Sequence, residues 1–159
     1  MNTFSVVFIL VFVIIMVVVG KKSYENGKRL AQEGKVSAKK GAFWKEKEVF
    51  TTSVSYEALC QKLKEADFSD TKASVQFDLN GEKMIFFQSS DAWNAVLEQC
   101  GARDGKNLFQ FYFSAWRTGQ SGTVKVLSMN VLVTMIEKTI LSLDPTATVC
   151  THKQQIRRS

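Results

Sequence analysis

The longest apolar stretch of the chain lies at its start. From Phe4 to Val19 the sequence has no charged residue, and Ser5 carries its only hydroxyl group. Together with residues 1–3 and Gly20, the stretch reaches about 20 residues, which cross a hydrocarbon core of roughly 30 Å as a helix rising 1.5 Å per residue. We therefore predict a transmembrane helix over residues 1–20 that anchors the protein in a membrane.

Two other interpretations of this stretch fit less well. A cleaved secretory signal has a positively charged start and a cleavage site of small residues. Met1 to Thr3 carry no charged side chain, and Val17 to Gly20 is not of the Ala-x-Ala type. A buried helix of a soluble domain is the third interpretation, but such a helix rarely contains a β-branched run of this length without polar residues. A membrane anchor fits both the length and the flanks.

Past its first quarter the chain shows the pattern of one folded domain. Residues 45–54 are rich in β-branched side chains and predict a strand. Ser55 can cap a helix over residues 56–66, in which apolar side chains recur at helical spacing. A strand followed by an amphipathic helix is typical of a domain with a single core.

A hairpin and a second helix are expected next. Residues 73–79 and 82–88 lie on either side of Asn80-Gly81, a turn typical of a β-hairpin. Ser90 can then cap a short helix that ends at Gly101. The apolar stripe of that helix would consist of Trp93, Val96, Leu97 and Cys100.

A long aromatic strand is predicted over residues 107–117, where side chains alternate between two faces. The face expected to meet the core holds Phe109, Phe111, Phe113 and Ala115. The opposite face holds Leu108, Gln110, Tyr112, Ser114 and Trp116. Residues 118–122 would form a loop, and residues 123–127 could return as the second arm of a hairpin.

The last elements complete an α+β domain. We predict a central buried helix over residues 129–143, capped by Ser128, because its apolar side chains lie nearly all round. Asp144-Pro145 would end it, and residues 147–151 read as a final strand. The expected order is β-α-β-β-α-β-β-α-β, with helices packed against an antiparallel or mixed sheet.

Charge divides the chain into parts. Residues 21–43 form a basic juxtamembrane linker with seven Lys or Arg and two Glu, a net charge of +5. Cytoplasmic flanks of membrane helices are rich in Lys and Arg, so we expect the N-terminus outside and the C-terminal domain in the cytoplasm. These cations either set this orientation alone or also contact anionic lipid headgroups. They are Lys21, Lys22, Lys28, Arg29, Lys35, Lys39 and Lys40.

The remaining charge argues against a nucleic-acid partner. The globular α+β domain, residues 44–152, has 11 Lys or Arg and 13 Asp or Glu. Residues 153–159 form a basic C-terminal tail. The overall charge of +6 therefore resides in the linker and the tail, and the domain itself is slightly acidic. A membrane surface explains this distribution without nucleic acid.

The linker contains glycines at a spacing of seven residues, at Gly20, Gly27, Gly34 and Gly41. On a helix continued from the membrane they would share one slowly drifting face, where another helix could approach. Glycine also weakens a helix by about 1 kcal/mol relative to alanine. We favour a polar, partly flexible tether, and the helical interpretation stays open.

Candidate chemistry is sparse. Cys60, Cys100 and Cys150 are widely spaced and form no disulfide-framework pattern, so we expect three reduced core cysteines. His152, the only histidine, would face the same side of a strand as Cys150, but side chains two residues apart on a strand lie too far apart for the hydrogen bond that a nucleophile pair needs. No further ligands form a metal motif with them. We predict no catalytic, cofactor or metal site, and thus no enzyme.

The best candidate for an interaction surface is aromatic. Tyr112, Trp116 and Arg117 belong to residue types that anchor protein interfaces. The alternative is that helices cover both faces of the sheet and these aromatic residues belong to the core.

Three functions remain open. We expect a single-pass, membrane-anchored interaction or regulatory module without enzymatic activity, whose partners are the membrane and an unidentified protein. One alternative is a domain that binds a small molecule or lipid in an apolar pocket between the sheet and the long helix. The third is a small hydrolase or transferase, which would need carboxylates or His152 to converge in a cleft. A domain exported to the extracytoplasmic side is a further alternative.

Overall fold

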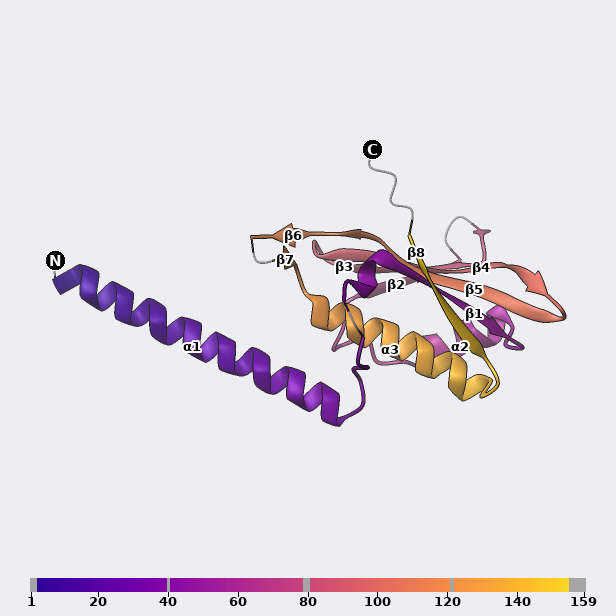
Figure 1. Ribbon diagram of the computed structural model, residues 1–159, viewed down its shortest axis with the longest axis horizontal. Coiled ribbons are helices and arrows are strands. Elements are labelled where there is room, and N and C mark those ends of the chain that lie inside the picture. Colours follow the sequence, from indigo (N-terminus) through magenta and orange to yellow (C-terminus); the bar gives the residue numbers. More distant parts are fainter. Residues whose placement is uncertain (1–2, 40, 79–80, 121, 155–159) are drawn as a thin grey trace. The chain divides into compact units, whose positions relative to one another are not determined.

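A computed structural model describes the chain except for residues 1–2, 40, 79–80, 121 and 155–159, and except for the side chains of residues 3–10. The chain forms two compact units, Met1–Ser37 and Ala38–Ser159. The first unit is a helix, and the second is an α+β domain (Figure 1).

Helix α1 (Thr3–Gln32) accounts for most of the first unit. Its 30 residues span about 45 Å at 1.5 Å per residue. The helix ends in a Schellman motif, in which Gly34 has a φ of +66°. There the amide of Gly34 donates to the carbonyl of Ala31, and the amide of Lys35 donates to that of Leu30. Glycine suits this position because it adopts positive φ without a steric cost.

The structure corrects the expectation of a flexible tether for the first half of the linker. Residues 21–32 continue the N-terminal helix, so Gly20 and Gly27 lie inside it. Gly34 terminates the helix, and Gly41 lies beyond it with a φ of +64°. The four glycines therefore do not form one helical face.

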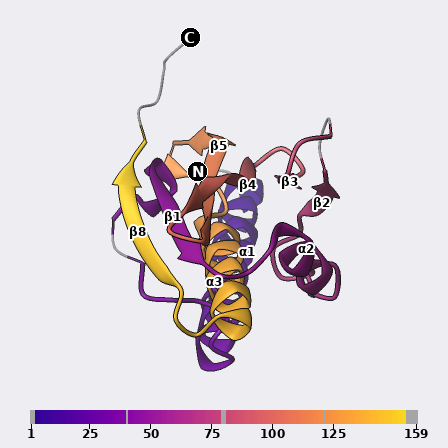
Figure 2. The same cartoon turned by 90° about the vertical axis from the view of Figure 1, so that its right-hand side faces the viewer.

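The second unit is built on a six-stranded sheet in the order β2-β3-β4-β5-β1-β8. Every pairing in this sheet is antiparallel, and β2 and β8 form its two edges (Figure 2). The strands are β1 (Glu46–Thr52), β2 (Ser74–Phe77), β3 (Met84–Ser89), β4 (Trp93–Arg103), β5 (Lys106–Trp116) and β8 (Thr148–Lys153). A short ribbon pairs β6 (Thr118–Gly119) with β7 (Gly122–Thr123).

Both helices of this unit contribute to one core on one face of the sheet. They are α2 (Tyr56–Lys64) and α3 (Val126–Leu143) (Figure 1). The strands and both helices contribute core residues that are 0% exposed. They include Phe50, Phe87, Phe109, Leu59, Leu63, Leu132 and Ile136. A 3-10 turn, η1 (Phe43–Lys45), leads into β1 and adds the buried ring of Phe43.

Helix α3 is the one helix, within the part searched, that is long and apolar enough to cross a membrane. Its residues Met129, Leu132, Ile136 and Ile140 are 0% exposed in the core, so its apolar character is explained by packing. The expected membrane span at residues 1–20 is helical from Thr3 onward. Because the side chains of residues 3–10 lie outside the described part, its crossing of a membrane remains a prediction.

The predicted helix between Ser90 and Gly101 is wrong, because this segment forms β4. The core residues Trp93, Ala95 and Leu97 alternate as in any strand, but Val96 is buried as well on the opposite face, and this gave the apolar residues a helical spacing. Ser114 has no partner between the pairs Asn94–Ala115 and Ala95–Phe113, and Cys100 has none between Gln99 and Gly101. These two bulges lie on β5 and at Cys100, outside the regularly alternating stretch from Trp93 to Leu97.

Other predictions hold with adjusted ends. Strand β1, the pair β2 and β3, and β8 appear where expected, and the hydroxyl of Ser55 accepts from the amide of Ala58 as an N-cap of α2. The cap predicted at Ser128 is wrong. Helix α3 begins at Val126, and the Ser128 hydroxyl accepts instead from the indole N–H of Trp93 at 3.0 Å.

Asp144 joins the end of α3 to the end of β1. Asp144 is only 5% exposed. One of its carboxylate oxygens accepts hydrogen bonds from the Thr52 hydroxyl at 2.8 Å, the Ser53 amide at 2.8 Å and the Ser53 hydroxyl at 3.0 Å. The other oxygen accepts from the amide and hydroxyl of Thr146. These bonds, first those from Thr146 and then those from Ser53 and Thr52, hold the pKa of Asp144 well below its usual range.

We expect Asp144→Asn to destabilise the domain by about 3 kcal/mol at pH 7, because an amide nitrogen would face donors that need an acceptor. The control Asp104→Asn, at an exposed ion pair, should change stability by no more than about 0.5 kcal/mol. Urea unfolding of the full chain in a mild detergent measures both.

The same variant has an expected pH dependence. Because the folded pKa of Asp144 is lowered, its stabilisation is present above the unfolded pKa of about 4 and is lost as the pH falls toward the folded value. Between pH 5 and pH 2.5 the unmodified chain should therefore lose more stability than Asp144→Asn. Equal losses would contradict this role.

Candidate functional site

Strand β5 extends beyond its neighbour β1. The last pair between them is Lys47 with Tyr112, whereas β5 continues to Trp116. On its other side β5 pairs with β4 up to Trp93 and Trp116. Residues 113–116 thus have a strand partner on one side only, within the part of the chain that the structure describes.

Loop and turn residues lie beside this unpaired segment. The amide side chain of Gln154 donates to the carbonyl of Phe113 over 3.4 Å, and the backbone amide of Gln154 donates to Lys45 at 3.0 Å. The ring of Phe43 meets that of Phe113 edge-on, with centroids 6.3 Å apart. The chain before β1 therefore turns away at η1, and the position next to residues 114–116 is not occupied by a strand.

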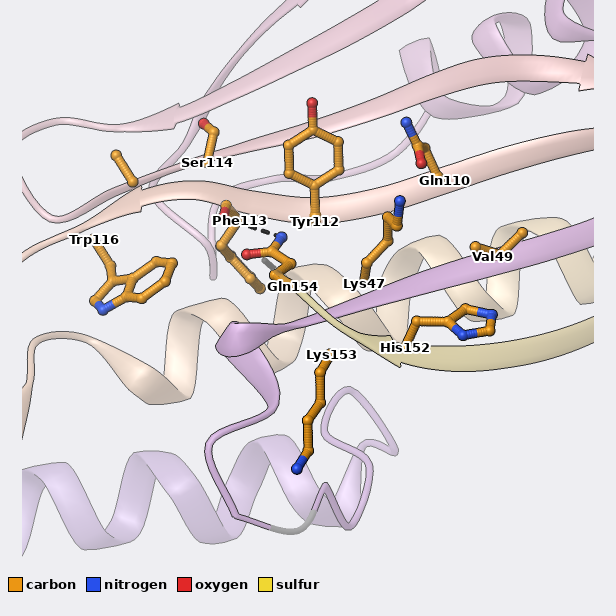
Figure 3. Close-up of a pocket in the computed structure, with 11 residues that line it drawn as sticks. Lys47, Val49, Gln110, Tyr112, Phe113, Ser114, Trp116, His152, Lys153 and Gln154 are labelled. Atoms are coloured by element: carbon orange, nitrogen blue, oxygen red, sulfur yellow. Dashed lines mark hydrogen bonds between the residues drawn. The ribbon is translucent and has the colours of Figure 1, made fainter. Parts of the chain in front are cut away.

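A groove of about 1040 Å³ occupies this place, and we call it the β5 groove (Figure 3). Its walls come from β1, β5 and the end of β8 with Gln154. The lining residues are Lys47, Val49, Gln110, Tyr112, Phe113, Ser114, Ala115, Trp116, His152, Lys153 and Gln154. These described residues include two lysines and the histidine but no carboxylate.

The floor of the β5 groove belongs to the sheet face opposite α2 and α3. Lys47 lies between Tyr112 on β5 and His152 on β8, since it is the register partner of both. Figure 3 shows the side chains of Tyr112 and Lys47 on the same side of the sheet, whereas Lys153 points away from them. This face brings an aromatic ring, an ammonium group and an imidazole into one row.

Two of the three predicted interaction residues line the β5 groove. Tyr112 is half-buried, and its burial, followed by the nearby charge of Glu98, raises the pKa of its hydroxyl. Trp116 lines the groove as well, but not from the expected face. The bulge at Ser114 places it opposite Trp93, and its side chain packs against the core. The same bulge leaves Ala115, expected in the core, exposed.

Arg117 lies outside the lining of the groove. Its guanidinium forms an exposed ion pair with Asp91, with 2.9 Å between Nη1 and Oδ2. Sequence analysis placed Gln110 on the face of Tyr112 without selecting it, and it missed Lys47 and Gln154. No local pattern marks them, because only the pairing of β1 with β5 and β8 brings them beside Tyr112.

The arrangement offers binding rather than catalysis. Cys150 and His152 lie on neighbouring rows of β8, where their register partners are Val49 and Lys47. Over the residues described, no cluster of three or more His, Cys, Asp or Glu side chains could hold a metal ion. The expected set of three core cysteines is corrected, because Cys60 is buried whereas Cys100 and Cys150 are exposed.

The basic residues proposed for lipid headgroups differ in their surroundings. On α1, Lys21, Lys22, Lys28 and Arg29 are exposed. Lys21 lies 3.9 Å from Glu25, and Arg29 and Lys35 pair with Glu33. Lys40 lies outside the described residues. The exposed cations are compatible with a membrane surface, and their contact with lipid stays a prediction.

Lys39 does not fit that group, because its ammonium turns into the domain. It bridges Glu48 on β1 and Glu137 on α3, at 2.6 Å from each carboxylate. Burial alone would lower the pKa of Lys39, but the bonds to Glu137 and Glu48 outweigh it and raise that pKa. Burial raises the pKa of Glu48, although the hydrogen bond from Lys39 acts in the opposite direction. Lys39 therefore fastens the segment before β1 to the domain.

We expect Lys39→Met to destabilise the domain by about 2 kcal/mol or more at pH 8, because two carboxylates would then face each other without a cation. The pKa of Glu48 is already raised, and it should rise further in the variant. The loss should therefore shrink as the pH falls to 5 and Glu48 binds a proton. Urea unfolding at both pH values tests this, with Lys62→Met at an exposed ion pair as the control. A loss independent of pH would contradict the assignment.

Comparison with known proteins gives no match to a family model, to a curated protein or to a solved structure. The interpretation of the β5 groove therefore depends on the residues that form it.

Proposed function

We propose that this protein is a single-pass, membrane-anchored interaction module, whose α+β domain binds a protein partner in the β5 groove at the membrane surface. It performs no chemistry of its own. The observation that carries the proposal is the groove itself, in which Tyr112, Trp116 and Lys47 surround a strand segment without a second partner.

Continuous apolar exposure supports the membrane anchor. The side chains from Val11 to Val19 are each 49–63% exposed on α1. A soluble protein rarely leaves a patch of this kind in water, and a bilayer would cover it. The proposed span continues toward residue 1 and ends near Gly20, where the exposed cations Lys21 and Lys22 follow.

The charge asymmetry supports an orientation with the N-terminus outside and the domain in the cytoplasm. In this orientation the exposed cations of α1 lie near anionic headgroups, each contributing about 1 kcal/mol to membrane attraction. The alternative is an exported domain, which maleimide labelling of Cys150 in intact cells would reveal.

Packing favours an interaction module over an enclosed ligand pocket. The side chains of Phe50, Leu132 and Ile136 are 0% exposed and occupy the space between the sheet and α3. The β5 groove lies on the other face of the sheet and opens to solvent. A site of this form suits a partner's surface segment better than an apolar ligand.

Photo-crosslinking tests the proposed interaction. With p-benzoylphenylalanine in place of Ser114, which lines the groove and is exposed, irradiated cells should give a discrete adduct of the full chain with a protein. The same group in place of Lys62, exposed on α2, should give none. Adducts of equal yield from both positions, or none from Ser114, would count against the groove.

Cysteine labelling in intact cells tests the orientation. In a chain that retains only Cys150, which is exposed, a membrane-impermeant maleimide should react only after lysis. A chain that retains only Cys60, which is 6% exposed, should require denaturation in addition and reports that the domain is folded. Labelling of Cys150 in intact cells would reverse the proposed orientation.

A further inference from the structure

The unpaired segment of β5 is built as a place for one more strand. Residues 113–116 continue a strand of 11 residues whose first part is paired on both sides. Strand edges with unpaired backbone groups readily accept an extended peptide, which adds main-chain hydrogen bonds. Here the edge lies inside a groove rather than along a flat surface.

A side chain already imitates the missing strand. The amide of Gln154 donates to the carbonyl of Phe113, the position that a backbone N–H of a neighbouring strand would take. At 3.4 Å this bond is longer than the 2.7–3.2 Å usual for N–H donors to carbonyl oxygens. A peptide amide could replace it with little loss of enthalpy.

The charges beside this edge select the kind of peptide. Among the described residues that line the groove, the charged side chains are Lys47 and Lys153 and none is Asp or Glu, and Lys47 lies on the same face as Tyr112. Complementary charge steers association and excludes partners of like charge, so the occupant that fits is acidic.

Aromatic walls complete the recognition surface. Tyr112 and Trp116 border the segment at its two ends, and the bulge at Ser114 places them on different faces of the strand. Successive side chains of an added strand also point to opposite faces. Alternating acidic and apolar residues in the occupant would therefore meet Lys47 on one face and Trp116 on the other.

We propose that the β5 groove binds an acidic segment of a partner protein in extended conformation, which adds as a short strand beside residues 113–116. This inference rests on the proposed function and specifies its partner. The segment takes the position of the Gln154 amide, and its carboxylates lie near Lys47.

Fluorescence anisotropy with the full chain in detergent micelles tests the proposal. The probe is a fluorescein-labelled hexapeptide of alternating Glu and Val, blocked at both ends. Two further probes have Lys in place of Glu, or N-methyl groups on alternate backbone amides. The acidic probe should bind, and each of the other two should bind at least about tenfold more weakly, because one loses charge complementarity and the other loses strand hydrogen bonds.

Variants locate the binding. Lys47→Glu should weaken the binding of the acidic probe about tenfold, the equivalent of about 1.4 kcal/mol in binding free energy. Lys62→Glu changes the charge equally on α2 and should have no effect. Protection of Cys60 from maleimide shows that each variant is folded. Binding that tolerates N-methylation would overturn strand addition, and equal binding of the Lys probe would overturn the acidic chemistry.

The outcomes separate this inference from the proposed function. If Ser114 crosslinks to a partner but the acidic probe does not bind, the interaction module stands and the acidic strand is wrong. If neither experiment gives binding in the groove, both proposals fail.

Discussion

The position of β1 in the sheet is the constraint on which the rest of the domain depends. This strand of seven residues lies between β5 and β8, although its register partners on β5 lie 55 to 65 residues further along the chain. Its pairing aligns Phe50 with Phe109 at the centre of the core. Because β5 has 11 residues, the difference in length leaves the segment that forms the β5 groove.

Hydrogen bonds to charged side chains hold β1 from two directions. At its C-terminal end Asp144 accepts hydrogen bonds from Thr52 and Ser53. Near its start Glu48 binds Lys39, which also reaches Glu137 on α3. A buried ion pair adds little net stability but is costly to break. Both contacts join α3 to β1, so the helix that fills the core also fixes the strand that shapes the groove.

Much of the fold could be predicted from the sequence where the pattern is local. The alternation of Phe109, Phe111 and Phe113 gave the core face of β5 correctly, as their burial shows. The pattern from Trp93 to Cys100 misled, because Val96 is buried on the face opposite Trp93, Ala95 and Leu97 and gave the stretch a helical spacing. What covers the second face of a strand depends on the rest of the fold, and so does a bulge such as that at Ser114, so a single strand's sequence displays neither.

The same limit applies to the candidate site. Tyr112 and Trp116 were chosen for their residue types and do line the groove, but the expected shared face is wrong because of the bulge at Ser114. Lys47 and Gln154 enter the site only through the sheet order, which brings β8 beside β1. Lys39 looked like one of seven linker cations, and its inward position requires Glu48 and Glu137, which lie far apart in the sequence.

The membrane anchor can compensate for the weak binding that is expected of so short a strand site. Four residues of strand addition provide few hydrogen bonds, each worth about 1 kcal/mol net, and ordering an extended peptide costs about as much per residue. Binding in the β5 groove by itself would therefore be weak. Confinement of the module and its partner to one membrane raises their effective concentration, as a linker does for two joined sites. In the proposed function the membrane anchor thus raises the binding that the groove alone would leave weak, and the positive charge of Lys47 selects acidic partners.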